Sequence, residues 1–314
     1  MPDAARAPKT GQDFLGLRTP VAPKRRRFRA GRNVLLFFAA VLALWEGLKA
    51  LGGDPWRYPN VLGTGFAVQF TPPMKLPFVS DLELPHVWDI VGALVNPVQR
   101  ESPTSLGQDL LQAAAYTWYE AIIGFAVGAL LGLVLATVFV HSRLAARAFV
   151  PYVVASQTIP IVALAPLVVF AFGQDVLAVV LIATYLTFFP VTIAGIRGLD
   201  SPDPRALELM RSYAASRWKI FWKVRLPASL PYLFTAFKIS ATASIVGAII
   251  GEGPGGIPNG LGRAIINFNQ QYISGPEKLW ATIFVSALVG VAFYVIVRLV
   301  ELWVLRTRPH AAIG

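Results

Sequence analysis

The sequence predicts an all-α integral membrane protein with about six transmembrane helices. Of its 314 residues, 55% are hydrophobic and only 14% are charged, whereas a soluble domain carries about a quarter charged residues. The apolar residues also occur in long runs, because 121–142, 148–174, 176–196 and 279–297 contain no Asp, Glu, Lys or Arg. A helix needs roughly 20 mostly apolar residues to cross the hydrocarbon core of a bilayer, and these runs meet or approach that length.

The individual spans differ in how clearly the sequence defines them. The first is the weakest, because Glu46 and Lys49 interrupt its outer end, and the fifth contains Lys238. We expect Pro160 and Pro166 to break the helix of the third. A Pro-rich, polar segment, 52–117, separates the first span from the second and is predicted to be extracytoplasmic. The predicted spans are 33–51, 118–140, 149–172, 176–196, 231–251 and 279–302.

The basic residues predict the orientation. Of the 28 Lys and Arg residues, 20 fall on one side of the six-span arrangement and six on the other. Since basic residues concentrate in cytoplasmic segments, both termini are predicted to be cytoplasmic. Residues 1–32 are expected to form a disordered basic tail before an uncleaved first span. This distribution explains the net charge of +11 without a nucleic-acid partner.

The sequence lacks the motifs of common enzymes. It has no cysteine, no G-x-x-x-x-G-K-[ST] loop for ATP and no His-Glu-x-x-His or G-x-S-x-G motif. We therefore predict no catalytic residue, no metal site and no cofactor bound by this chain. A proton-driven carrier usually places several ionisable groups in mid-membrane, whereas most candidates here lie near the ends of spans.

The loop after the fourth span, 197–229, contains the most informative pattern. Pro204 suits the first turn of a helix, and 214–216 marks a break after which Ser216 is a candidate N-cap. In the second helix, Trp218, Phe221 and Trp222 form one aromatic face. Pro227 is expected to end that helix. The loop is therefore predicted to be a short helix-turn-helix at the cytoplasmic surface. A basic amphipathic helix resting on anionic lipid is the generic alternative.

The spacing in this loop resembles the EAA loop of bacterial ABC-importer permeases. Glu208 lies six positions before Ala214, Val224 lies ten after it, and Leu226-Pro227 completes the pattern. Leu209-Met210 replaces the family's Ala-Ala, and Ala214 replaces its Gly. If that position needs a positive φ, alanine there costs about 1 kcal/mol or more.

The resemblance extends over about 88–306, to the branch that serves sulfonate, taurine, nitrate, hydroxymethylpyrimidine and riboflavin import. It implies a type I ABC-importer permease architecture, with 118–306 as the transmembrane domain. It also implies two ATP-binding subunits that bind the ATP, a second permease copy, and an extracytoplasmic solute-binding protein. The implied ATPase-coupling residues are Glu208, Ala214, Ala215, Ser216, Leu226 and Pro227. A secondary carrier would explain the spans but would leave the spacing of the loop to chance.

Several polar groups at membrane depth are candidates for lining a solute path, with helix-helix hydrogen bonding as the alternative. Gly124, Gly128 and Gly132 form two overlapping G-x-x-x-G steps, which favour close helix packing over a pore role. The segment 267–272 is rich in amide and aromatic groups, which suit a flat heteroaromatic solute through stacking and hydrogen bonds. A docking face for the binding protein and an ordinary interfacial helix are the alternatives. Together with the family resemblance, the segment favours riboflavin or a pyrimidine as the solute. Sulfonate, taurine or nitrate is the alternative. The solute-path candidates are Gln157, Thr158, Ser240, Ser244 and Glu252.

Overall fold

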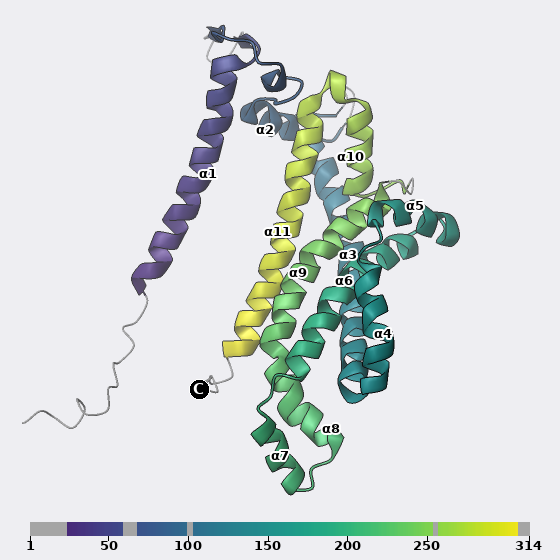
Figure 1. Ribbon diagram of the computed structural model, residues 1–314. Helices are drawn as coiled ribbons and strands as arrows, with labels where there is room; N and C mark the ends of the chain where they lie inside the picture. Colours follow the sequence, from purple (N-terminus) through teal and green to yellow (C-terminus); the bar gives the residue numbers. More distant parts are fainter. Residues whose placement is uncertain (1–23, 59–67, 99–102, 254–256, 307–314) are drawn as a thin grey trace, which may run out of the picture. The chain divides into compact units, whose positions relative to one another are not determined.

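The computed structural model describes residues 24–58, 68–98, 103–253 and 257–306 (Figure 1). The chain divides into two compact units, Met1–Val79 and Ser80–Gly314. Within the described residues, five helices are long and apolar enough to cross a membrane, or six if one bent pair of helices counts as a span. The prediction of an all-α membrane protein is confirmed.

The first unit contains one long helix and a small hairpin. Helix α1 (Lys24–Gly52) includes the predicted span 33–51 and begins before it, so the end of the predicted tail is helical. The rest of that tail, 1–23, lies outside the described residues. Strands β1 (Trp56–Tyr58) and β2 (Val68–Phe70) pair antiparallel, with Trp56 opposite Phe70, and a short 3-10 helix, η1 (Pro77–Val79), follows.

The second unit is built around four long helices that pack against one another (Figure 1). They agree with the predicted second, fourth, fifth and sixth spans, although α3 begins well before Trp118 because Ser105 and Gln108 form a capping box at its start. The shorter α2 (Val87–Val95) precedes them. The four helices are α3 (Leu106–His141), α6 (Val176–Leu199), α9 (Leu226–Glu252) and α11 (Pro276–Arg306).

The glycine stripe of α3 faces α6. A Cβ on Gly128 would lie 2.6 Å from the Cβ of Thr187, and a Cβ on Gly132 would lie 2.7 Å from the carbonyl oxygen of Phe188. Real side chains do not approach so closely, so these positions need glycine for α3 and α6 to pack. The helix-packing interpretation of the G-x-x-x-G steps is confirmed.

The predicted third span, 149–172, is not one continuous helix. Helices α4 (Arg143–Ser156) and α5 (Ile161–Phe172) meet at an angle of 99°. Pro160 stands at the N-cap of α5, where its missing N–H costs no intrahelical bond. Pro166 lies inside α5 and does not end it, contrary to the prediction. The pair forms either a broken span or a re-entrant loop.

Candidate functional site

The loop between α6 and α9 forms the predicted helix-turn-helix. Helix α7 (Pro204–Ser212) begins at Asp203, whose side chain accepts a hydrogen bond from the Arg205 N–H at 2.8 Å. Pro204 occupies the first turn, where a missing N–H is tolerated. The break predicted at 214–216 lies directly after α7.

The turn that ends α7 places Ala214 in the left-handed region, with φ of 53°. The Ala214 N–H bonds to the Arg211 carbonyl at 2.9 Å, and the Ala215 N–H bonds to the Met210 carbonyl at 3.0 Å. These two bonds define a Schellman motif, in which the left-handed residue is usually glycine. The structure therefore explains why the family pattern has Gly where this chain has Ala.

The second helix begins as predicted but does not end at Pro227. Ser216 caps α8 (Arg217–Ile220) by accepting a hydrogen bond from the Lys219 N–H at 3.3 Å. A π-helical turn, η2 (Phe221–Arg225), then leads directly into α9. The Leu226 N–H bonds to the Phe221 carbonyl five residues back, and this wider turn lets the helix pass through Pro227. The segment Arg217–Glu252 is consequently a continuous helical element.

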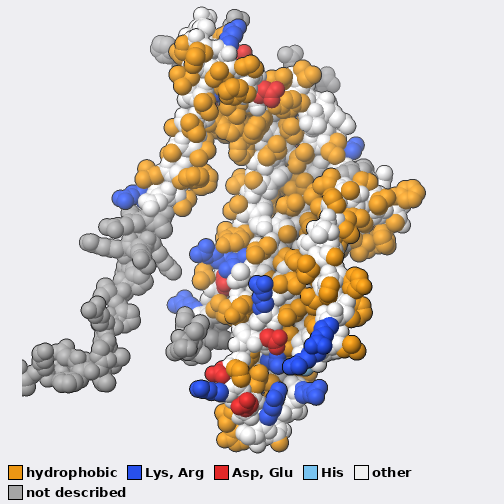
Figure 2. Space-filling model, viewed as in Figure 1, with side chains coloured by type: hydrophobic (Ala, Val, Ile, Leu, Met, Phe, Trp, Pro, Cys, Tyr) orange, Lys and Arg blue, Asp and Glu red, His pale blue; other side chains and the backbone are white. Residues whose placement is uncertain are grey.

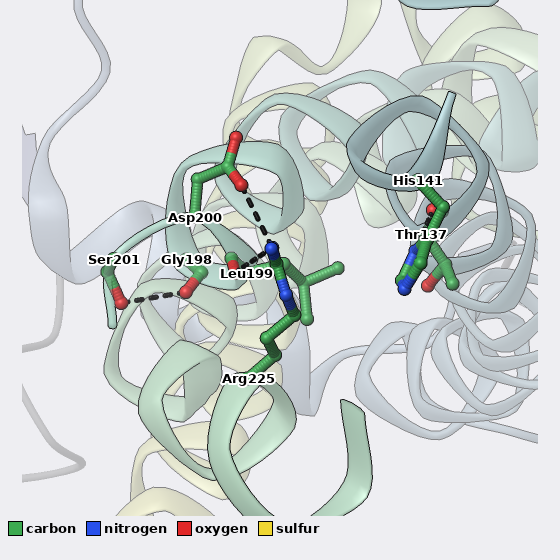
Figure 3. Close-up of polar contacts among 7 residues, drawn as sticks. All are labelled: Thr137, His141, Gly198, Leu199, Asp200, Ser201 and Arg225. Carbon is green, nitrogen blue, oxygen red and sulfur yellow. Dashed lines mark hydrogen bonds and ion pairs between the residues drawn. The ribbon is translucent and has the colours of Figure 1, made fainter. Parts of the chain in front are cut away.

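Arg225 joins this element to the end of α6 (Figure 3). Its Nη1 donates to the Leu199 carbonyl oxygen at 2.8 Å and lies 2.9 Å from Oδ1 of Asp200. Leu199 is the last residue of α6, so its carbonyl has no partner within that helix. Phe221 packs against Leu199 and Ala136, the latter on α3. The base of the loop is thus fixed to two other helices.

The far end of the loop is exposed and basic. Figure 2 shows Lys and Arg side chains gathered over the end of the second unit that carries α7 and α8. Of the predicted aromatic face, Phe221 turns inward while Trp218 and Trp222 stay 67% and 51% exposed. Glu208 is exposed, and its carboxylate makes no hydrogen bond or ion pair with another described residue. The loop is held by the caps of α7 and α8 and by Arg225.

The predicted solute-path residues do not form one surface. Gln157 and Thr158 lie exposed at the bend between α4 and α5. Ser240 and Ser244 lie on the buried face of α9, where Ser240 donates to the Thr187 carbonyl at 3.2 Å and Ser244 to the carbonyl of Ala241, on its own helix. The path assignment of these four residues stays a prediction.

Glu252 is fully buried at the end of α9. Its Oε2 accepts a hydrogen bond at 2.7 Å from the N–H of Gly262, in the first turn of α10 (Leu261–Gln270). Its assignment to the solute path likewise stays a prediction.

A polar cleft of about 580 Å³ lies between α3, the turn 258–260 and α10. Asn267 lines the cleft and belongs to the segment 267–272 that the sequence analysis related to a solute. Tyr116 and Tyr119 of α3 also line it, and the sequence analysis did not predict a role for them. With Asp109 and Gln112 they form one polar face of α3 at helical spacing, which is the only feature of the sequence that could have indicated this cleft. The polar residues lining the cleft are Asp109, Gln112, Tyr116, Tyr119, Asn259, Arg263 and Asn267.

The described residues contain no group of three His, Asp or Glu side chains that could hold a metal ion. Two features stand out among the described residues: an exposed loop fixed to long helices, and a polar cleft between α3 and α10.

Residues 128–306 match the family model described as binding-protein-dependent transport system inner membrane component. The chain is 31% identical over 229 residues to the formylaminopyrimidine transport permease protein ThiX of Halalkalibacterium halodurans, covering 70% of this chain and 90% of the relative. It is 32% identical over 161 residues to the riboflavin transport system permease protein RibX of Chloroflexus aurantiacus, covering 51% and 59%. It is 28% identical over 165 residues to the nitrate import permease protein NrtB of Leptolyngbya laminosa, covering 52% and 57%.

Proposed function

We propose that this chain, which belongs to the family of binding-protein-dependent transport system inner membrane components, passes a small heteroaromatic solute such as riboflavin or a pyrimidine across the membrane. The chain is a multi-pass inner-membrane permease of an ABC importer for small solutes. Permeases of this family work with ATP-binding subunits and with binding proteins. The identity of the solute is the part that we propose.

The polar cleft is the observation that carries this proposal. The rings of Tyr116 and Tyr119 offer stacking surfaces, and the amides of Asn259 and Asn267 offer both donors and acceptors. A flat ring with several nitrogen and oxygen atoms needs both kinds of contact. Two relatives are named for formylaminopyrimidine and riboflavin, which are such solutes.

The charges in the cleft also favour an uncharged solute. Arg263 is balanced by Asp109, so the lining residues bring no net positive charge. An inorganic anion or a sulfonate would need an excess of donors or cations. Import of sulfonate, taurine or nitrate is the second candidate, supported by the nitrate-importing relative.

The loop supports a mechanism for coupling transport to ATP. We propose that α7 docks into a cleft of an ATP-binding subunit, with Glu208 free to bind that partner. Ala214, Ala215 and Ser216 then set the angle between α7 and α8, and Leu226-Pro227 passes the movement into α9. Two copies of the chain would form one path, with both termini on the side of the ATP-binding subunits.

Reconstitution into lipid vesicles with the cognate ATP-binding subunit and binding protein tests the proposal. We expect riboflavin or hydroxymethylpyrimidine, but not taurine or nitrate, to stimulate ATP hydrolysis. The double variant Tyr116→Leu/Tyr119→Leu should lose this stimulation, whereas the control Tyr152→Leu, at an exposed position on α4, should keep it. Stimulation by taurine or nitrate alone would establish the second candidate.

The same preparation tests the coupling loop. Glu208→Lys reverses the charge of an exposed side chain and should abolish solute-stimulated ATP hydrolysis without unfolding the chain. If the wild-type chain binds no ATP-binding subunit at all, the coupling mechanism fails and a secondary carrier becomes the better explanation.

A further inference from the structure

Two glutamates from helices far apart in the sequence meet inside the second unit. Glu120 lies on α3 and Glu252 at the end of α9, and both are fully buried, with 0% of their surface exposed. Thr117, one turn before Glu120 on α3, and Glu252 bond the adjacent N–H groups of Leu261 and Gly262, so the two glutamates come to the same turn. Neither residue lines the polar cleft or lies in the loop between α6 and α9.

Glu252 and its neighbour Thr117 hold the start of α10. Glu252 Oε2 accepts from the Gly262 N–H at 2.7 Å, and the Thr117 hydroxyl oxygen accepts from the Leu261 N–H at 2.9 Å. These are the first two N–H groups of α10, which have no partner within the helix. The first turn of α10 is thereby fastened to both α3 and α9.

Two glycines make this close approach possible. Gly260 has φ of 98°, and a Cβ there would overlap the carboxyl group of Glu252. A Cβ at Gly262 would overlap the carbonyl oxygen of Ile249 on α9. The backbone at 260–262 can therefore lie directly on Glu252 and the end of α9 only because both residues are glycine.

Three of the four carboxyl oxygens have no hydrogen-bond donor among the described residues: both oxygens of Glu120 and Oε1 of Glu252. No basic side chain in the described ranges forms an ion pair with either glutamate. The other titratable groups that act on the pair are Asp175, at the N-cap of α6, and Tyr116 on α3, neither of which supplies a positive charge. Two adjacent carboxylates in such a place would be unpaired buried charges, which proteins avoid.

One bound proton would remove the unfavourable contact between two buried carboxylates. An ionised carboxylate can only accept hydrogen bonds, whereas a protonated carboxyl group also donates one. With a proton on Glu120, its O–H donates to the free Oε1 of Glu252, which keeps its bond to Gly262. The pair then carries one negative charge, which lies at the positive end of the α10 dipole.

We propose that Glu120 and Glu252 form a binding site for one proton, and that this proton latches the start of α10 onto α3 and α9. When α10 moves away, both carboxyl groups meet water and the proton passes to solvent as the O–H bond of Glu120 breaks. Raising the pH then favours the released form of α10. Because the turn 258–260 lines the polar cleft, the latch determines whether that cleft keeps its shape.

Infrared spectroscopy of the full chain in lipid bilayers at neutral pH tests for the proton. A protonated carboxyl group absorbs apart from carboxylates, and its band shifts in heavy water. We expect this band in the wild type and in the exposed-site control Glu83→Gln, and its loss in Glu120→Gln/Glu252→Gln. A double variant whose spectrum keeps the whole band, or a wild type without one, would overturn the proposal.

Distance measurements test the latch itself. Since the chain has no cysteine, cysteines placed at the exposed positions Gln112 on α3 and Asn267 on α10 accept spin labels specifically. We expect the distance between the labels to lengthen as the pH rises. Glu120→Gln supplies a permanent N–H donor and should keep the short distance at every pH, whereas Glu120→Ala should give the long one. The same pH response in wild type and Glu120→Gln, or none in either, contradicts the latch.

Discussion

Replacing Ala214 with glycine should stabilise the turn of the coupling loop. Ala214 has φ of 53°, where a side chain costs roughly 1–2 kcal/mol relative to glycine. Glycine also gives the unfolded chain more conformational freedom, which lowers the gain in stability by about 0.4–1 kcal/mol. The net stabilisation of the turn is therefore about 0.5–1 kcal/mol, and both hydrogen bonds of the Schellman motif remain possible.

Hydrogen exchange of the amides of Ala214 and Ala215 measures this change directly, because both N–H groups are bonded within the motif. Since about 1.4 kcal/mol corresponds to a factor of ten, exchange in Ala214→Gly should slow about two- to fivefold. The matched control is Ala215→Gly, whose φ is not positive. That variant gains no relief of strain and should exchange faster than the wild type. Faster exchange in Ala214→Gly, or the same effect in both variants, would refute the reasoning.

Three further substitutions test the contacts between the long helices of the second unit. Gly128→Ala should destabilise the protein by about 1–3 kcal/mol, because the added methyl group forces α3 away from α6. The control Gly290→Ala, with open space around the added methyl group, should not destabilise it, and thermal unfolding in detergent compares the two variants. Arg225→Gln should lower the unfolding temperature more than Asp200→Asn, because only the former leaves a carbonyl at the end of α6 without its donor. Lys238 Nζ lies 2.7 Å from Glu301 Oε2 between α9 and α11, so Lys238→Met should destabilise by up to about 3 kcal/mol, and adding Glu301→Gln should recover most of that loss.

The coupling loop could be predicted largely from the sequence because its determinants are local. Pro204 at the first turn, the break at 214–216 and the cap by Ser216 each depend on residues within a few positions of one another. The spacing pattern predicted strain at Ala214 on the condition that its position needs a positive φ, and the structure gives φ of 53° there. Local hydrogen bonds and the allowed backbone regions determine such caps and turns, so contacts with distant parts of the chain have little influence on them.

The failures came from prolines whose effect depends on their neighbours. Pro227 was expected to end a helix, yet the π-helical turn before it absorbs the missing N–H and the helix continues. Pro166 was expected to break the third span and instead lies within α5, while Pro160 marks the bend. The sequence shows that a proline removes a hydrogen bond, but the surrounding turns determine whether the chain bends.

The buried carboxyl pair was missed for a different reason. The sequence analysis placed Glu252 among the candidates for a solute path, and Glu120 lies near the start of the predicted second span, 118–140. Each observation concerns one residue, whereas the feature depends on two helices meeting. A sequence indicates that burying an ionisable group in an apolar run is energetically unfavourable. Only the fold shows which neighbouring group lowers this unfavourable free energy.

The continuous helix Arg217–Glu252 connects the proposed coupling loop with the proposed proton site. Its 36 residues correspond to a length of about 54 Å at 1.5 Å per residue. Trp218, at one end, belongs to the exposed loop, and Glu252, at the other, belongs to the pair that holds α10. Had Pro227 ended the helix, a movement of the loop could have been lost in a flexible joint. Because the helix is unbroken and fixed to α6 through Arg225, a tilt imposed at Trp218 also displaces Glu252, and the proton-holding pair lies where that displacement would open the start of α10.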